Sequence, residues 1–203
     1  MLIPILLLVV LGSLAMTPWV LRVKLESRLA MAASSVAGVP VAVFCQSFGE
    51  AFVDAGSESG YVEFGPDGVP ERQTLIKREQ CADLRSYLRS DKLQPSREQV
   101  AAVHTLTHES IHMSGVTNES ETECIALQRD AEMARHLGAS TEGASALAQL
   151  YWQVVYPLMP PGYRSGECRP GGALDLKGPD SPWRAGSLAR AGRVSGGRGR
   201  SSP

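Results

Sequence analysis

The pattern His-Glu-Ser-Ile-His at residues 108–112 contains side chains whose types and spacing are suited to metal chemistry. Residues four apart lie on one face of a helix, so a helix here directs the imidazoles of His108 and His112 towards one point. Two neutral histidines that meet in this way supply two ligands of a zinc ion. Glu109 then stands where it can hold a metal-bound water and take its proton. The pattern predicts metal-assisted hydrolysis.

The surrounding residues predict the helix that this chemistry requires. Ser96 with Gln99 three residues later fits a capping box, and Gly115 can end the helix with a positive φ. Apolar residues recur between these ends without a helix breaker. The predicted helix therefore spans residues 97–113. The alternative, that the histidines are partly exposed residues of a surface helix, is left open by the sequence.

A catalytic zinc ion needs a third protein ligand, and the residues after His112 offer several. Asn118 with Glu121 three residues later predicts the N-cap of a second helix, which returns beside the first. Glu119 falls in the first turn of that helix, so we favour it as the third ligand. The alternatives are weaker, because an amide such as Asn118 binds zinc poorly and Glu121 points about 200° away from Glu119. His104 lies about 12 Å from His112 along the helix axis and is expected to line the cleft.

Residues 108–126 resemble the gluzincin metalloproteases, the thermolysin-like zinc peptidases whose third ligand is a helical glutamate followed four residues later by an acid. Glu119 and Glu123 fit this pattern. The resemblance implies that Glu123 accepts a hydrogen bond from a ligand histidine and fixes its tautomer. The spacing departs from that group, because only six residues separate His112 from Glu119. From His112 to Asn118 the chain is closer to the metzincin pattern, with an amide in place of the last ligand.

The resemblance implies a zinc peptidase that acts on peptides or proteins. Zn²⁺ held by His108, His112 and Glu119 would polarise the scissile carbonyl, and Glu109 would be the general base. Three residues are candidates for stabilising the oxyanion: His104, His136 and Tyr163. Two alternatives stay open. One is a non-catalytic metal-binding protein of the cell envelope whose site is closed by Asn118 or His104, and the other is an interaction protein without metal.

The N-terminal residues predict contact with a membrane. Residues 2–21 carry no charge and are rich in Leu, Ile and Val, and as a helix they would span about 30 Å, the thickness of a bilayer core. We interpret residues 1–29 as a transmembrane or signal-anchor segment. The basic residues Arg22, Lys24 and Arg28 would favour a cytoplasmic domain by the positive-inside rule.

The four cysteines indicate the opposite side of the membrane. None belongs to a Cys-x-x-Cys pair, and an even number behind an export-like segment predicts disulfides in an oxidising compartment. We favour the pairs Cys45–Cys81 and Cys124–Cys168, although four reduced thiols remain an alternative. The domain is therefore placed on the extracytoplasmic side, or secreted if the segment is cleaved.

The remaining pattern predicts an α+β fold, a mainly helical zincin-like domain over residues 30–177 with a small antiparallel sheet. Residues 30–38 are interpreted as a tether, and residues 178–203, rich in Gly, Ser and Arg, as a disordered tail. The expected strands are 39–44, 60–64 and 73–76, and the expected helices are 81–88, 97–113, 119–137 and 141–156. By the resemblance, the edge strand would hold an extended peptide. A net charge of −1 gives no indication of a nucleic-acid partner.

Overall fold

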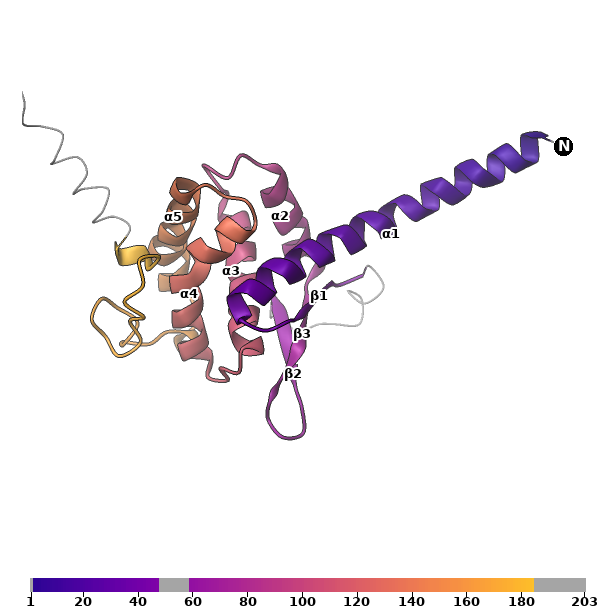
Figure 1. Cartoon of the computed structure of the whole chain (residues 1–203). Helices are drawn as coiled ribbons and strands as arrows, with labels where there is room; N and C mark the ends of the chain where they lie inside the picture. Colours follow the sequence, from indigo (N-terminus) through magenta and orange to yellow (C-terminus); the bar gives the residue numbers. More distant parts are fainter. Residues whose placement is uncertain (1, 48–58, 185–203) are drawn as a thin grey trace, which may run out of the picture.

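The structure is a computed structural model that describes residues 2–47 and 59–184, with side chains from Trp19 onward. Its helices surround one face of a small sheet, and the predicted α+β class is confirmed (Figure 1). The helices are α1 (Leu2–Ala37), α2 (Arg78–Arg89), α3 (Arg97–Met113), α4 (Glu119–His136) and α5 (Thr141–Leu150). The strands are β1 (Ala42–Cys45), β2 (Gly60–Phe64) and β3 (Pro70–Ile76). A π-helical turn (Tyr151–Val155) and two 3-10 turns (Tyr156–Leu158, Pro161–Tyr163) follow α5.

The sheet has the order β1-β3-β2, and the prediction that it is antiparallel is correct only for β2 and β3. β1 runs parallel to β3, with Cys45 opposite Ile76. Parallel pairing places the ends of both strands together, so that Cys45 lies beside Cys81 in the first turns of α2, where the predicted disulfide is formed. Alternation of apolar residues along a strand is the same for both directions, which is why the sequence did not distinguish them.

Helix α1 continues through the segment predicted to be a tether. Its last turns bury Leu29, Ala33 and Val36 in the core, and the helix ends before Gly38, whose φ is +73°. The small residues of this segment therefore allow close packing of α1 on β1, α3 and α4, rather than marking a flexible linker. Arg129 donates to the backbone oxygen of Val36 at 2.9 Å and fixes the end of α1 on α4.

The predicted membrane segment, residues 2–21, lies almost entirely outside the part of the chain whose side chains are described. Within the described part, no helix is both long enough and apolar enough to cross a membrane.

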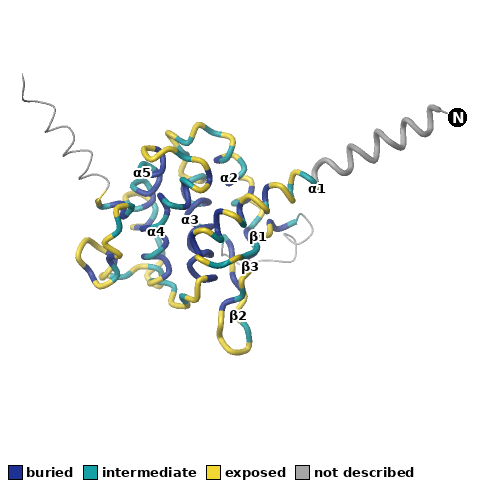
Figure 2. The backbone as a smooth tube through the Cα atoms, viewed as in Figure 1, coloured by how far each residue is buried: buried dark blue, intermediate teal, exposed yellow. Residues whose placement is uncertain are grey.

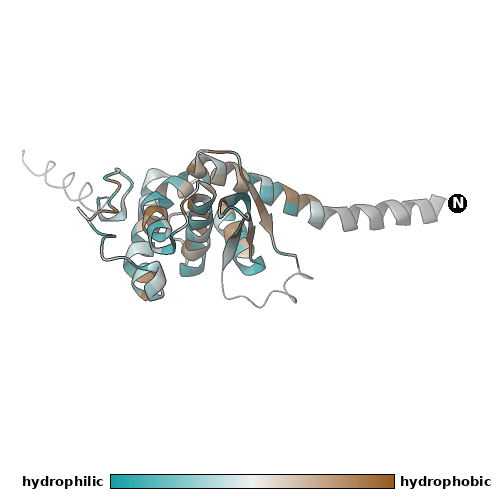
Figure 3. Cartoon of the chain, turned by 90° about the horizontal axis from the view of Figure 1, so that it is seen from below, coloured by the Kyte–Doolittle hydropathy of each residue, from teal (hydrophilic) through white to brown (hydrophobic). Residues whose placement is uncertain are grey.

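The hairpin of α3 and α4 forms the centre of the domain. The predicted capping box is present, because Ser96 accepts from Gln99 N and Gln99 accepts from Ser96 N. α3 is buried from Val100 to Met113 except at Ala101 and Thr105, which are half-buried (Figure 2). Gly115 has a φ of +109°, so the chain turns after α3 and α4 returns alongside it. The helices of the domain carry both hydrophilic and hydrophobic residues (Figure 3).

The second predicted disulfide, Cys124–Cys168, is also formed and ties the C-terminal segment to α4. Gln128 donates to the backbone oxygen of Leu174 at 2.8 Å, and Arg135 forms a two-pronged ion pair with Asp180 at 2.9 and 2.6 Å. Residues 178–184 therefore pack on the domain, and the prediction of a disordered tail is wrong for them. The rest of that predicted tail lies outside the described residues.

Candidate metal centre

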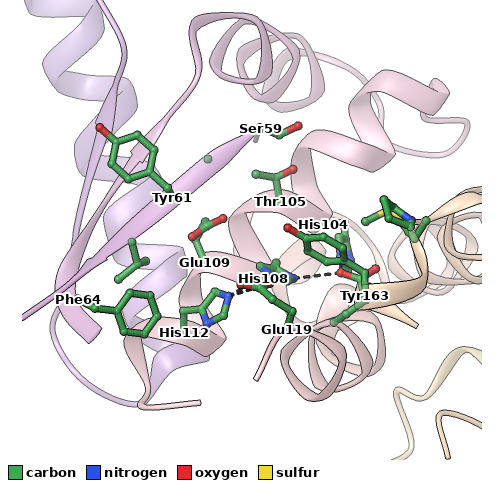
Figure 4. A pocket seen from close by; sticks show the side chains of 15 residues that line it. Ser59, Tyr61, Phe64, His104, Thr105, His108, Glu109, His112, Glu119 and Tyr163 are labelled. Atoms are coloured by element: carbon green, nitrogen blue, oxygen red, sulfur yellow. Dashed lines mark hydrogen bonds and ion pairs between the residues drawn. The ribbon is translucent and has the colours of Figure 1, made fainter. Parts of the chain in front are cut away.

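His108, His112 and Glu119 converge where α4 begins beside the end of α3 (Figure 4). The Nε2 atoms of the two histidines are 3.0 Å apart. Glu119 Oε2 lies 3.2 Å from His108 Nε2 and 3.4 Å from His112 Nε2. The position of Glu119 is set by the predicted N-cap, since the side-chain oxygen of Asn118 accepts from Glu121 N at 3.0 Å.

These three ligand atoms form a triangle of the size that a metal ion requires. Ligands at about 2.0–2.1 Å from a tetrahedral zinc ion lie about 3.3–3.4 Å from one another. The observed separations are 3.0, 3.2 and 3.4 Å. Two imidazole nitrogens and one carboxylate oxygen are also a donor set of catalytic zinc sites that keep a fourth position open. The group can therefore hold a metal ion.

Hydrogen bonds on the far side of each ring orient the two histidines. His108 Nδ1 donates to Glu123 Oε2 at 3.0 Å, and His112 Nδ1 donates to the backbone oxygen of Val116 at 2.8 Å. Nε2 is therefore the atom that each ring offers to a metal ion. Burial acts to lower the pKa of His108, but hydrogen bonds to Glu119 and Glu123 outweigh it and raise this pKa to about 9. A metal ion bound here would replace the proton on His108 Nε2.

Glu109 is buried next to the ligands without being one of them. It is 5% exposed, and among the described residues its Oε2 has no hydrogen-bond partner. Burial raises the pKa of Glu109 to about 7, with the charge of Glu119 adding to this shift and that of His108 opposing it. A carboxyl group with a pKa near 7 can both accept and return a proton at neutral pH.

Behind the ligands lies a buried cluster of charged side chains from α3 and α4. His104 directs Nε2 to Glu123 Oε2 and Nδ1 to Asp130 Oδ2, both at 2.9 Å. The hydroxyl of Tyr151 donates to the other oxygen of Glu123, and its ring stacks on His104 with the centroids 3.5 Å apart. Glu123 thus accepts hydrogen bonds from three side chains, those of His104, His108 and Tyr151.

The side chains of this cluster shift one another's pKa values and so determine which of them are charged. Burial acts to lower the pKa of His104, but the charges of Asp130 and Glu123 outweigh it and raise this pKa to about 10. Burial acts to raise the pKa of Glu123, but the charge and hydrogen bonds of His104 and His108 hold it far below its usual range. At neutral pH, His104 is therefore an imidazolium between two carboxylates.

The cleft above the centre has apolar and aromatic walls. Strand β2 contributes Tyr61, Val62 and Phe64 to one wall, and Met159, Pro160 and Tyr163 contribute to another. Phe64 meets His112 edge-on with the ring centroids 6.1 Å apart, and the ring of Tyr163 lies 5.9 Å from that of His108. The side chains of Phe64, Glu109 and Tyr163 surround the two histidines in Figure 4.

The chain was compared with protein-family models, curated proteins and solved structures. No match was found. The side chains of the centre are therefore the basis for inferring its function.

The structure brings together the five residues that the sequence singled out for the centre: His108, Glu109, His112, Glu119 and Glu123. The expected hydrogen bond from a ligand histidine to Glu123 is present. Among the candidates for oxyanion stabilisation, His104 and Tyr163 line the cleft. His136 does not, because it lies in the last turn of α4, 40% exposed and 4.0 Å from Glu132.

Sequence reasoning missed Asp130 and Tyr151. A signal existed for Asp130, because it follows Glu123 by seven residues and so lies on the same face of α4 two turns later. Tyr151 had no such signal. It reaches the cluster from the π-helical turn after α5, and its spacing there agrees equally well with a core position.

Proposed function

We propose that the protein is a zinc-dependent metallopeptidase. The observation that carries the proposal is the triangle of ligand atoms from His108, His112 and Glu119. The carboxylate of Glu109 is buried beside it, and its Oε2 has no hydrogen-bond partner among the described residues. Burying a hydrogen-bond acceptor without a donor costs free energy of folding, so such an acceptor indicates a functional role. A metal-bound water could donate to this oxygen.

The open fourth position distinguishes this proposal from a structural metal site. The two residues that could close the site are engaged elsewhere. The side-chain oxygen of Asn118 caps α4, and both ring nitrogens of His104 are hydrogen-bonded to carboxylates. A substrate or a water molecule can therefore take the fourth position, as catalysis requires.

In the proposed reaction, bound zinc would supply Lewis acidity, which polarises the scissile carbonyl and acidifies a water molecule. Glu109 takes the proton of the attacking water on its free oxygen and returns it to the leaving amine. Glu123 keeps His108 in the tautomer that offers Nε2, through the bond from His108 Nδ1. Tyr163, whose ring lies 5.9 Å from that of His108, is our candidate for the donor to the oxyanion.

A peptide or protein is the proposed substrate. Strand β2 lies at one end of the strand order, so within the described residues only one of its sides is paired. The same strand lines the cleft. We propose that an extended peptide lies along the cleft wall to which β2 contributes, and so brings its main chain past the centre.

The proposed location is the outer side of a membrane, or outside the cell. The two disulfides require an oxidising compartment in most organisms. The uncharged N-terminal sequence is the first part of helix α1, which continues into the domain. We propose that this sequence anchors the protein or directs its export. A measurement of accessibility to a membrane-impermeant amine reagent in intact cells would test the side.

The test of the proposed function is metal content and peptide hydrolysis of the purified full chain. We expect one zinc per chain in the parent and a marked loss of zinc in His112→Ala and in Glu119→Ala. Glu109→Gln is the matched control, because it keeps the three ligands and should keep zinc. This variant should nevertheless lose about 10²–10⁴-fold in kcat, the usual contribution of a general base.

Two results would contradict the proposal. If the parent chain holds no metal after refolding with zinc, the three residues do not form a metal centre. If Glu109→Gln hydrolyses peptides as fast as the parent, Glu109 is not the general base.

A further inference from the structure

His104 lies one helical turn before the first ligand histidine and has no part in the reaction proposed above. It is 4% exposed, and its ring is held from three sides by Glu123, Asp130 and Tyr151. Burying this charged ring with its two carboxylate partners costs desolvation free energy, and replacing such a buried charged group as a whole by apolar residues is often neutral or stabilising. Because His104 lies one helical turn from His108, we expect it to serve the proposed metal centre.

The hydrogen bonds of His104 define that role. Both of its ring nitrogens face carboxylate oxygens, which are acceptors, so both nitrogens donate. The oxygen of Glu123 that accepts from His104 Nε2 is the same atom that accepts from His108 Nδ1. The position of this single oxygen thus depends on His104 and decides the orientation of His108.

We propose that His104 is a positioning residue of the metal centre: it clamps the carboxylate of Glu123 against His108 and so holds His108 Nε2 towards the metal ion. Asp130 has the matching task on the other side of the ring, since its Oδ2 fixes the direction of His104 through Nδ1. The chain of contacts runs from Asp130 through His104 and Glu123 to His108. This inference rests on the metal centre of the proposed function but not on the hydrolysis of any substrate.

A second metal ion is the alternative occupant of this cluster. His104, His108 and Glu123 also have ligand atoms within 4.8 Å of one another. A metal ion there would have to displace the proton that His104 Nε2 donates to Glu123 and the proton that His108 Nδ1 donates to it. Hydrogen bonding therefore accounts for this cluster without an ion. Two zinc ions per chain in the test below would overturn the positioning role.

Two substitutions test separately the hydrogen bonds of His104 to Glu123 and to Asp130. In His104→Gln, the amide nitrogen falls near the place of Nε2 and can still donate to Glu123, while the donor to Asp130 is lost. In His104→Asn, the amide nitrogen falls near the place of Nδ1 and can still donate to Asp130, while the donor to Glu123 is lost. Each variant leaves one buried carboxylate without its hydrogen bond from residue 104. The two variants should therefore destabilise the core in the same way.

The measurement is the zinc affinity of the full chain, determined by competition with a chromogenic chelator. We expect His104→Asn to weaken zinc binding about 10–100-fold, the usual effect of losing a partner of a ligand histidine. We expect His104→Gln to stay within about 3-fold of the parent, well below that effect. Equal losses in the two variants, or no loss in His104→Asn, would overturn the proposal. A parent that binds no zinc would overturn it together with the proposed function.

Nitrogen-15 NMR of the zinc-loaded parent tests the clamp without any substitution, and so covers the case in which a variant does not fold. We expect both ring nitrogens of His104 to carry protons at neutral pH, and His108 to carry its proton on Nδ1. A His104 ring without a proton on Nε2 cannot donate to Glu123, and this result would overturn the proposal.

Discussion

Three glutamates surround the candidate centre, and their surroundings assign them different tasks. Glu119 is half-exposed, and hydrogen bonds from His108 are the largest cause that lowers its pKa, so it remains a carboxylate able to bind a metal ion. Glu123 is buried with every oxygen engaged. Glu109 is buried with one oxygen free and a pKa of about 7. In the proposed centre, one residue type would therefore supply a ligand, an orienting group and a base, depending on burial and neighbours.

The residues of the proposed centre and Glu123 behind it were predicted from the sequence, whereas Asp130 and Tyr151 were not. His108, Glu109 and His112 follow from helical spacing alone, and Glu119 follows from the N-cap at Asn118. Tyr151 belongs to a different helical segment, 28 positions after the glutamate to which it donates. No local periodicity connects such a pair, because the contact arises only when α5 packs on the α3–α4 hairpin.

The charge of His104 should make the free energy of unfolding of the metal-free chain depend on pH. Its pKa is about 10 in the fold against a usual value of 6.5, raised by Asp130 and Glu123 against the effect of burial. The folded state therefore binds the proton more tightly, so the stabilisation is fully present below pH 6.5 and is lost as the pH rises through 10. We expect the difference in free energy of unfolding between the parent and His104→Gln to shrink from pH 6.5 to pH 10.

Urea unfolding of the full chain in the presence of a chelator measures this difference. His104→Gln is the proper reference because the amide does not titrate, while every other titrating group is common to both chains. A difference that stays constant over this pH range would mean that His104 is not charged in the fold.

At the scale of elements, the approach of β2 to α3 depends on Gly60. A Cβ atom at this position would lie 2.9 Å from Ile76 Cδ1, 3.2 Å from Thr105 Cγ2 and 3.3 Å from Glu109 Cγ. The absence of a side chain thus lets the strand that lines the cleft lie directly against the proposed base. This is a close approach in the interior rather than a matter of backbone dihedral angles.

We expect Gly60→Ala to displace β2 or Glu109 and to destabilise the chain by about 1–3 kcal/mol, the usual cost of overpacking. Zinc should be retained, because the atoms nearest to the added methyl group belong to Ile76, Thr105 and Glu109 and not to the three proposed ligands, while peptide hydrolysis should fall. Gly166→Ala is the control, since a Cβ atom there meets nothing within 4 Å. Calorimetric melting and kcat/KM at saturating zinc measure both effects. Equal behaviour of the two variants would show that β2 does not constrain Glu109.

The elements themselves were largely predictable. The capping box at Ser96 and Gln99 and the N-cap at Asn118 set the starts of α3 and α4, and both helices begin where these residues predict. The direction of β1 and the helical character of residues 30–37 were predicted wrongly. Both depend on long-range packing: β1 is aligned by its partner β3, and the last turns of α1 are stabilised by the core that they cover.

At the scale of the whole molecule, the two disulfides stabilise different parts of the domain. Cys45–Cys81 ties β1 to α2, and Cys124–Cys168 ties the C-terminal segment to α4. Cys124 directly follows Glu123, so the second bond begins next to the orienting carboxylate of the centre. The C-terminal segment is then held along α4 by Gln128 and Arg135.

Removing the two bonds should therefore cost similar stability but have different effects on the centre. The bonds span 36 and 44 positions, and loop entropy gives about 4 kcal/mol for a closed loop of either length. We expect the double variants Cys45→Ser/Cys81→Ser and Cys124→Ser/Cys168→Ser to lose comparable free energy of unfolding in metal-free urea titrations. Zinc affinity should fall about 10-fold or more only in the second, because α4 carries Glu119 and Glu123.

This comparison also tests whether the centre is coupled to the C-terminal segment, since each double variant is the control for the other. A loss of zinc affinity that simply follows the loss of stability would appear equally in both. Unchanged zinc affinity in Cys124→Ser/Cys168→Ser would mean that α3 and the first turns of α4 hold the centre by themselves. The segment around Cys168 would then cover the core without holding Glu123, whose orientation would depend on His104, His108 and Tyr151.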